Sequence, residues 1–390
     1  MQHQPTPRIA IACGGTGGHL FPGLAVAEQL IQRGCTVTLL ISPKEVDQQA
    51  VKAASGMQVA TLPAVGLGRG SRIAFVRGFI QSTFAARKLF KQERPEAVLA
   101  MGGFTSAPPV VAAKAMGVPT FLHESNTIPG RANRWLSRIV KEAFIGFPEA
   151  ALRLHTWHAK ATGTPVRPQF RPSDSAVCRV ALGLNPDKPV LVVTGGSQGA
   201  SGLNDMVISA LPMLVKLVPG LQLVHLTGPN DVEKVEKACT ANGIKAFVRP
   251  FFAEMNVALG AASAVISRAG ASSLAELAAM HVPSVLVPFP AATDNHQYYN
   301  ALAFQKTGAA HLLEQKSANP ETLAKLIAEL IQVPGVREKM CEALGQWHAP
   351  RAAEQIAESI MKAITDRRRI AGKAGMTETS TLQHHQSAIT

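Results

Sequence analysis

Short apolar runs alternate with amphipathic stretches along most of the chain. Residues 8–13 read RIAIAC, 24–30 read LAVAEQL at helical spacing, and 35–42 read CTVTLLIS. Apolar runs rich in β-branched residues are typical of buried parallel strands, and the stretches between them are typical of crossover helices. The pattern therefore predicts an α/β fold built on parallel sheets.

The same pattern repeats on a larger scale. A strand, a double glycine and an amphipathic helix begin at Arg8 and again at Pro189. A strand, a glycine turn, a helix and a second strand opened by Val-Pro begin at Ala97 and again at Ala264. This tandem repetition predicts two doubly wound, Rossmann-like domains that face each other across a cleft.

Domain boundaries are expected where the periodicity weakens. The stretch 146–172 is rich in proline and is the expected linker. Beyond Asp366 the sequence is polar and poor in large apolar groups, which predicts disorder. The expected units are an N-terminal domain over 1–165, a C-terminal domain over 166–346, a C-terminal helix over 347–365 that returns to the N-terminal domain, and a disordered tail over 366–390.

Length and composition agree with two domains. A chain of 390 residues is long for one core, and a 46% hydrophobic content is enough to fill two. No stretch of about 18 residues lacks charges and helix breakers, and no basic segment precedes an apolar one at the start. We therefore expect neither a transmembrane helix nor a signal peptide. The five cysteines never stand at C-x-x-C spacing, which indicates reduced thiols and argues against disulfides and a zinc site.

The net charge of +13 raises the question of a polyanionic partner. No nucleic-acid motif is recognisable and aromatic residues are only 5%, so we expect no nucleic acid. Between Arg69 and Arg94, seven basic residues stand against one acid, with four phenylalanines interleaved. A basic, Phe-bearing helix is a candidate for an anionic membrane surface, with Phe75 or Phe79 dipping into the interface. The alternative is an ordinary helix with its phenylalanines in the core and its arginines in water.

Residues 14–23, GGTGGHLFPG, follow the first strand and open a helix. Glycines let a backbone expose its N–H groups to a ligand, and a helix N-terminus favours an anion, so the loop is a candidate phosphate site. It is not the dinucleotide fingerprint, because Leu20 stands where a small residue is required, and no Walker Gly-Lys-Ser/Thr follows. Hydride transfer is therefore disfavoured. His19 lies at the mouth of the loop and is a candidate base.

Four such segments should meet at one cleft, because parallel sheets bind ligands at the carboxyl ends of their strands. They are 16–19; 101–106 with 123–126; 195–199; and 267–276 with 294–297. Each has a structural alternative. A Gly-Gly turn can be a tight connection, Glu276 a capping-box partner, Asn126 a helix cap, and His123 a buried core histidine.

Six segments together resemble the motifs of the MurG family within the two-Rossmann (GT-B) glycosyltransferases. They are GGTGGHLFPGLAVAEQL, MGGFTSAPP, HESNTIPGRANRWLS, GGSQGASGLND, SRAGASSLAELAA and DNHQYYNA, in order between about Arg8 and Ile364. Members transfer N-acetylglucosamine from UDP-GlcNAc to lipid I, undecaprenyl-pyrophosphoryl-N-acetylmuramyl-pentapeptide, in peptidoglycan synthesis. The chain departs from the family pattern at Ser125, where several members have Gln, and at Thr164, where the linker often has Asn.

The resemblance implies which residues bind UDP-GlcNAc. They are Thr16, Gly17, Gly18, Asn126, Arg167, Ser197, Phe252, Ala271, Ser272, Ser273, Leu274, Ala275, Glu276 and Gln297. Chemistry agrees with several of these assignments. Ser197 would meet the diphosphate at a helix N-terminus with Arg167 as its cationic partner, and the Glu276 carboxylate can accept both ribose hydroxyls.

The implied reaction is an inverting displacement in which the muramyl 4-hydroxyl attacks the anomeric carbon and UDP leaves. His19 is the expected base. No Asp-x-Asp occurs, which predicts stabilisation of the diphosphate by amides and helix dipoles with no metal and no cofactor. The expected partners are UDP-GlcNAc, lipid I and an anionic membrane surface, and the expected location is peripheral, on the cytoplasmic face of the plasma membrane, with the N-terminal domain facing the acceptor and the membrane.

Three alternatives remain open at this point. A GT-B transferase with a soluble acceptor would share the donor site but would not need the basic Phe-bearing stretch. A UDP-GlcNAc 2-epimerase would isomerise the donor without an acceptor. A binding protein of the same fold would have no activity.

Overall fold

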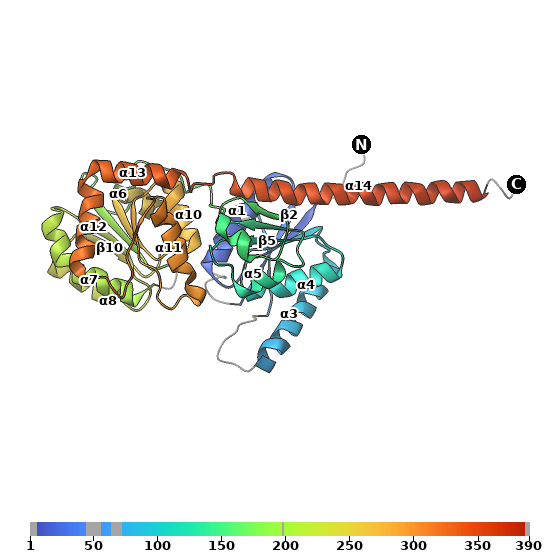
Figure 1. Cartoon of the computed structure of the whole chain (residues 1–390), viewed down its shortest axis with the longest axis horizontal. Coiled ribbons are helices and arrows are strands. Elements are labelled where there is room, and N and C mark those ends of the chain that lie inside the picture. The colour runs from blue at the N-terminus through green and yellow to red at the C-terminus, as the bar shows by residue number, and fades with distance from the viewer. Residues whose placement is uncertain (1–5, 44–55, 64–71, 197–198, 387–390) are drawn as a thin grey trace.

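The computed structural model describes residues 6–43, 56–63, 72–196 and 199–386, with residues 72 and 372–386 described through their backbone alone. Within these ranges two parallel sheets lie side by side, one in each half of the chain (Figure 1). The first sheet has the order β3-β2-β1-β4-β5-β6-β7 and the second the order β10-β9-β8-β11-β12-β13. The predicted α/β class with two doubly wound domains is confirmed.

The strands of the first sheet are β1 (Arg8–Ala12), β2 (Thr36–Ile41), β3 (Gln58–Thr61), β4 (Ala97–Ala100), β5 (Thr120–Glu124), β6 (Glu142–Ile145) and β7 (Ala159–Ala161). Those of the second are β8 (Val190–Thr194), β9 (Gln222–Leu226), β10 (Ala246–Arg249), β11 (Ala264–Ser267), β12 (Ser284–Leu286) and β13 (His311–Leu312).

The helices of the N-terminal half are α1 (Gly17–Gln32), α3 (Arg72–Gln92), α4 (Ala107–Ala115) and α5 (Arg131–Leu136), with 3₁₀ turns η1 (Phe104–Ser106) and η2 (Pro148–Arg153). Those that follow are α6 (Ser175–Ala181), α7 (Ser201–Leu217), α8 (Val232–Ala241), α9 (Met255–Ala261), α10 (Ala271–Met280), η3 (Thr293–Asn295), α11 (His296–Lys306), α12 (Pro320–Gln332), α13 (Pro334–Gly345) and α14 (Ala352–Gln386).

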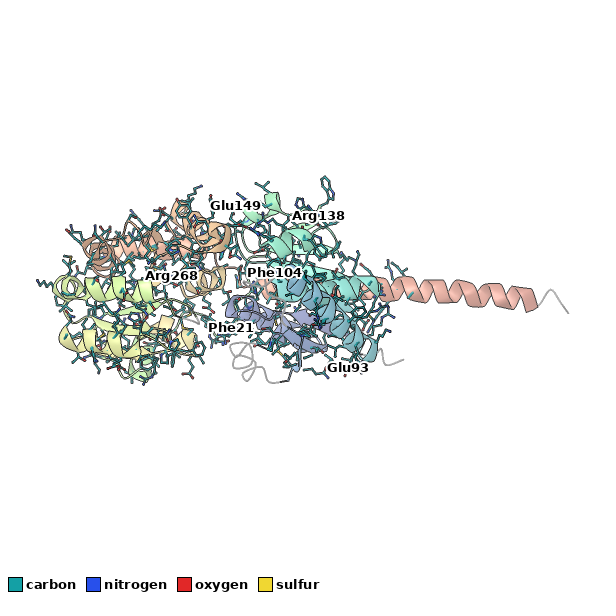
Figure 2. The ribbon with its side chains drawn as sticks, turned by 90° about the horizontal axis from the view of Figure 1, so that it is seen from below. Phe21, Glu93, Phe104, Arg138, Glu149 and Arg268 are labelled. Atoms are coloured by element: carbon teal, nitrogen blue, oxygen red, sulfur yellow. The ribbon has the colours of Figure 1, made fainter. Side chains whose placement is uncertain are left out.

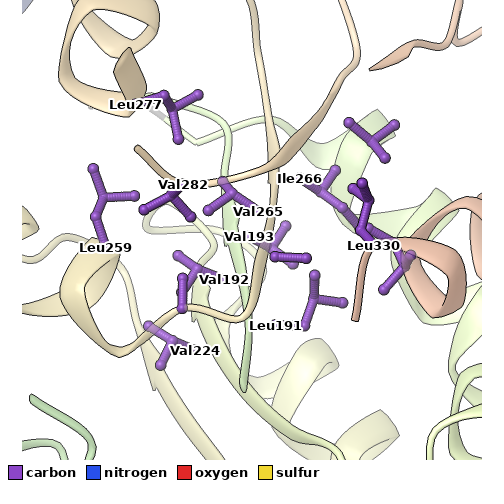
Figure 3. Close-up of a cluster of buried hydrophobic side chains, with 14 of the residues drawn as sticks. Leu191, Val192, Val193, Val224, Leu259, Val265, Ile266, Leu277, Val282 and Leu330 are labelled. Atoms are coloured by element: carbon purple, nitrogen blue, oxygen red, sulfur yellow. The ribbon is translucent and has the colours of Figure 1, made fainter. Parts of the chain in front are cut away.

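The sequence repeats occupy equivalent places in the two sheets. β1 and β8 are the strands that begin the first repeat, and β4 and β11 those that begin the second. In each sheet the two lie side by side and parallel. Figure 3 shows the result in the second core, where Val192 and Val193 of β8 lie beside Val265 and Ile266 of β11. The repetition in sequence is therefore a repetition of the topological switch point, where such sheets bind ligands.

Helix α14 lies against the N-terminal half, although it follows the C-terminal half in the chain. Its Ile356, Ile360 and Ile364 are buried on the face of the first sheet that α1 also covers. The connection between the halves runs from β7 to α6, and the predicted domain boundary at 165/166 falls within it.

The expectation of disorder over 366–390 is corrected as far as Gln386, because α14 continues to that residue (Figure 1). The segment has no proline and many good helix formers, so a helix already anchored on the core can propagate through it. Arg368 also holds it, donating from Nε and an NH2 group to the two carboxylate oxygens of Glu96 over 2.7 and 2.6 Å.

Helix α3 corrects the expectation that Phe75 or Phe79 reaches into a membrane. Both rings are partly buried: Phe75 lies edge-on to Phe104 with centroids 5.7 Å apart, and Phe79 packs on the core. Other apolar side chains of α3 are exposed instead, and they recur every three or four residues, hence on one face. They are Ile73, Val76, Ile80 and Phe84. Arg69 lies outside the described residues.

Over the described residues, none of the helices combines the length and the apolar character that crossing a bilayer requires.

Candidate active site in the cleft between the halves

A cavity of about 490 Å³ lies between the two halves and receives residues from both. Its walls come from segments that follow the carboxyl ends of β1, β4 and β5 in the first sheet and of β8 to β12 in the second. Phe21, labelled in Figure 2, lies on α1 at the border with the second half and lines the cavity. The four glycine and polar segments of the sequence therefore converge.

The first glycine loop places His19 on the cavity wall. The imidazole lies against Gly102 and Gly103, where an added Cβ would come within 3.0 and 3.2 Å of the ring. Both glycines also have positive φ, of +114° and +76°. Each position therefore favours glycine for two reasons, the space that the imidazole takes and the backbone conformation. Nδ1 of His19 lies 3.3 Å from Oγ1 of Thr16. The ring is thus held between two glycine segments where it lines the cavity.

Beneath this histidine, His123 has a structural role. It is fully buried, its Nε2 lies 3.1 Å from the carbonyl of Gly163, and its Nδ1 lies 3.2 Å from Oγ of Ser125. Burial lowers its pKa to about 4, so the ring is neutral near pH 7. The alternative interpretation of His123 as a core histidine is therefore the correct one, and Ser125 is its partner.

Glu124 lies in the predicted segment 123–126, but the sequence assigned it no role of its own. It lines the cavity with 2% of its surface exposed, and burial raises its pKa. Oε1 accepts bonds from N and Nδ2 of Asn126, at 2.9 and 3.1 Å. Oε2 accepts bonds from N of Gly130 at 3.0 Å and from Nδ2 of Asn133 at 2.7 Å. The carboxyl thereby holds the whole loop 126–130 against the cavity.

Glu276 lines the cavity from the second half, and Arg167, on the connection between the halves, lies between it and α1. The Arg167 guanidinium lies over the rings of Phe21 and Phe170, at 4.5 and 5.2 Å from their centroids, and its Nε is buried without a partner among the described residues. Burial raises the pKa of Glu276 to about 7, against the opposing charge of Arg167. The N-cap of α10 is Gly270, which has no side chain, so a capping-box role for Glu276 has no partner there.

Side chains of the two halves also bond to each other across the cleft. Ser272 donates from Oγ to the carbonyl of Gly18 over 2.9 Å, which joins α10 to the first glycine loop. At the rim, Arg134 of α5 and Asp294 of η3 form an ion pair at 2.6 Å.

Most of the predicted residues line this one cavity. They are His19, Thr16, Gly17, Gly18, Asn126, Arg167, Phe252, Ala271, Ser272, Ser273, Glu276 and Gln297. Leu274 and Ala275 do not, and Leu274 is instead part of the second core. The reason is helical: α10 presents only one face to the cavity, and Leu274 points to the opposite side. Ser197 lies outside the described residues.

In the described part of the chain, no group of three or more His, Cys, Asp or Glu side chains is placed to hold a metal ion.

Known proteins of similar sequence and structure share this architecture. The family models for the N-terminal and C-terminal domains of glycosyltransferase family 28 match residues 9–145 and 190–357. The chain is 39% identical to the UDP-N-acetylglucosamine–N-acetylmuramyl-(pentapeptide) pyrophosphoryl-undecaprenol N-acetylglucosamine transferase of Anaeromyxobacter sp. (strain K), over 92% of this chain and 94% of that one.

Among solved structures, MurG of Acinetobacter baumannii superposes with a TM-score of 0.69 at 31% identity, over 92% of this chain and all (100%) of that one. A UDP-N-acetylglucosamine 2-epimerase superposes with a TM-score of 0.66 at 13% identity, over 93% of this chain and 98% of that one. The second likeness is one of fold alone.

Proposed function

This chain belongs to the MurG family of UDP-N-acetylglucosamine transferases, and on that premise we propose how its two halves divide the reaction. The enzyme is a hexosyltransferase of peptidoglycan synthesis. It moves N-acetylglucosamine from UDP-GlcNAc to the 4-hydroxyl of the muramyl sugar of lipid I and so forms lipid II. The observation that carries the proposal is a single cavity with the imidazole of His19 on one wall and the carboxyl of Glu276 on the other.

The C-terminal half, 166–346, holds the donor. Glu276 accepts hydrogen bonds from the ribose hydroxyls, and the backbone at Phe252 meets the uracil. Arg167 and the N-termini of α7 and α10, with Ser197 on the loop before α7, stabilise the diphosphate as it leaves. Gln297, whose Oε1 accepts a bond from N of Phe289 at 2.9 Å, is positioned by that bond for the sugar hydroxyls.

Other donor contacts complete this set. Thr16, Gly17, Gly18 and Asn126 reach the donor from the N-terminal half, and Ala271, Ser272 and Ser273 from α10. Leu274 and Ala275 belong to the same helical turn without facing the cavity.

The N-terminal half, 1–165, holds the acceptor and the base. His19 takes the proton of the muramyl 4-hydroxyl as that oxygen attacks the anomeric carbon. The anomeric configuration inverts, and UDP departs toward the cationic wall. The cradle of Gly102 and Gly103 supports this role, because it fixes in place a ring that lines the cavity. We propose that the step needs no metal, since the chain has no Asp-x-Asp and helix N-termini face the diphosphate.

A transfer assay tests this function. Radiolabelled UDP-GlcNAc is incubated with a lipid I analogue, and the label is expected in the lipid-linked product only when the acceptor is present. Label in an isomerised UDP-sugar without acceptor would support the epimerase instead. Transfer to soluble sugars but not to the muramyl acceptor would support a different GT-B enzyme.

The acceptor's undecaprenyl chain stays in the bilayer, so the enzyme must come to the membrane. We propose that the outer face of α3 is the contact, on the cytoplasmic side of the plasma membrane. Ile73, Val76, Ile80 and Phe84 are exposed there. Arg77, Arg87, Lys88 and Lys91 are exposed as well, and each stands three or four residues from an apolar residue of the stripe or from another of these basic residues, so they lie on the same side of the helix. The N-terminal end of α3 touches η1 through Phe75 and Phe104, directly after Gly103 of the cavity, so a lipid bound at this face lies close to the site.

Charge reversal tests the membrane contact. Arg77→Glu with Lys88→Glu should weaken binding to vesicles that contain anionic phospholipid by at least about 30-fold, since each lost basic residue near such a surface costs about 1 kcal/mol and the new carboxylates are repelled. The matched control is Lys216→Glu with Lys306→Glu, which makes the same change of net charge on the C-terminal half. Equal effects of the two pairs would contradict a localised contact, and so would binding that is insensitive to salt.

A further inference from the structure

A buried amide lies in the interface between the halves. Asn300, on α11 of the C-terminal half, is 0% exposed. Its Oδ1 accepts bonds from both N and Oγ1 of Thr127 in the N-terminal half, each 2.9 Å long. Its Nδ2 donates to Oδ1 of Asn126 at 3.0 Å and to the carbonyl of Ala269 at 3.1 Å. One side chain thus joins a loop of the first half to the backbone of the second.

Both ends of this connection lead to the cavity. On the N-terminal side, Asn126 and Thr127 begin the loop 126–130, which Glu124 holds through Asn126 and Gly130. On the C-terminal side, Ala269 directly precedes Gly270, the N-cap of α10. The acceptor-side loop and the donor helix therefore share Asn300 as a common anchor.

The other direct connections between the halves are more exposed to solvent and involve fewer hydrogen bonds. The Arg134–Asp294 pair has both side chains about a third exposed, at 36% and 35%, and exposed ion pairs contribute little. The Ser272–Gly18 bond is single and solvent-accessible. Loss of the Asn300 amide, by contrast, leaves a buried N–H at Thr127 and a buried carbonyl at Ala269 without this partner, which is costly.

We propose that Asn300 is a positioning residue of the transfer reaction, which aligns the acceptor-side loop 126–130 with the donor helix α10. The expected effect on kcat rests on the proposed function, whereas the expected effect on the order of the loop 126–130 does not. Two reacting groups on separate halves meet only if the halves are aligned, and a misplacement of about 1 Å lowers a rate about 10²-fold. The amide contacts no reacting atom and acts through Asn126, Thr127 and Ala269.

The test uses the full-length enzyme with Asn300→Ala. We expect kcat to fall about 10²-fold while the Kd for UDP changes less than about 3-fold, because UDP binds the C-terminal half. Amide hydrogen exchange over 125–130 should become at least about tenfold faster, although the substitution lies in the other half. Thr127→Val removes only the Oγ1 donor and should give smaller changes in the same direction, so it serves if Asn300→Ala does not fold.

The matched control is Gln222→Ala. Gln222 is 3% exposed and exchanges two bonds with the backbone of Asn185, at 2.8 and 2.9 Å, at the amino end of β9 away from the cleft. This variant should lose stability like Asn300→Ala but keep kcat and the exchange rate over 125–130. Unchanged exchange over 125–130 in Asn300→Ala would overturn the proposal, and so would a loss of kcat that follows the loss of stability equally in both variants. If the wild type transfers no sugar, the proposed function fails, whereas the exchange experiment still decides whether Asn300 positions the loop.

Discussion

Helices α3 and α9 occupy equivalent places in the two halves, yet they differ in length and in how far their apolar side chains are buried. Each connects the third strand of its half to the strand that pairs with the first one, β4 beside β1 or β11 beside β8. α3 has 21 residues and exposes an apolar stripe, whereas α9 has 7 and buries Ala258 and Leu259. Phe252, just before α9, and Met255, its first residue, line the cavity. One topological connection thus serves the outside of the molecule in the first half and the donor cavity in the second.

The loops after β1 and β8 differ in the same way. The first, GGTGGH, ends in the titratable His19, while the second, GGSQGAS, has no titratable side chain. A proton acceptor is needed where the acceptor hydroxyl reacts, and hydrogen-bond donors are needed where the diphosphate leaves. The two halves therefore share one fold but serve different parts of the reaction: proton transfer in the first half and stabilisation of the leaving diphosphate in the second.

The largest expected effect tests the base on the N-terminal side. His19→Ala should lower kcat about 10²- to 10⁴-fold, the usual contribution of a positioned general base, while the Kd for UDP stays unchanged. The control is His155→Ala, which removes an exposed histidine of the same half. A kcat within a few-fold of wild type would mean that the base lies elsewhere.

The pH dependence of stability tests the donor wall. The folded-state pKa of Glu276 is raised from 4.5 to about 7, so the folded chain keeps this proton over a range where the unfolded chain releases it. Its contribution is fully present below pH 4.5 and is lost as the pH rises through 7. Relative to Glu276→Gln, the free energy of unfolding of the wild type should fall by up to about 3 kcal/mol between pH 4 and 8, measured by urea denaturation. Parallel curves for the two proteins would contradict this interpretation of the buried carboxyl.

Binding of UDP tests the role of the same carboxyl in recognition. At pH 8, where the Glu276 carboxyl is ionised, Glu276→Ala should weaken UDP binding about 10- to 150-fold, because hydrogen bonds to a charged acceptor are worth about 1.5–3 kcal/mol. Calorimetric titration measures the change, with Glu254→Ala, at an exposed position before α9, as the control. Unchanged affinity would remove Glu276 from the donor site.

The smallest effect concerns the stripe on α3. Ile80→Ser with Phe84→Ser should weaken vesicle binding by about 2 kcal/mol in total, since a fully buried side chain of this size contributes about 1.5–3 kcal/mol and insertion here is partial. The melting temperature should not change, because the two side chains are 47% and 65% exposed. Phe75→Ser provides the contrast: it breaks the contact with Phe104 and should lower the melting temperature. The reverse outcome would place the stripe in the core.

The sequence predicted the sheets and the convergence of the glycine loops because strand period and glycine turns are local signals. It could not predict which side of a helix faces which neighbour. On α10 the motif residues Ala271 to Glu276 divide between cavity and core, and on α3 the phenylalanines and the aliphatic residues lie on different faces. Those choices depend on partners such as Phe104 that are distant in the chain.

Glu124 escaped prediction for a related reason. Glu124 is the last residue of a buried strand, and nothing in the sequence there indicates the four hydrogen-bond donors that the loop 126–130 and Asn133 bring to its carboxyl group. The only signal was its place in the segment 123–126 at the end of a predicted strand, which marks a cleft but not a role.

The division of labour between the halves is tested most directly by hydrogen exchange with each substrate alone. UDP should slow exchange over 250–253, beside Phe252 on the donor wall, and leave 102–106 unchanged. A soluble lipid I analogue should slow exchange over 102–106, beside His19, and leave 250–253 unchanged. If both ligands protected the same segment, or if each protected the segment assigned to the other, the division between an acceptor half and a donor half would be wrong.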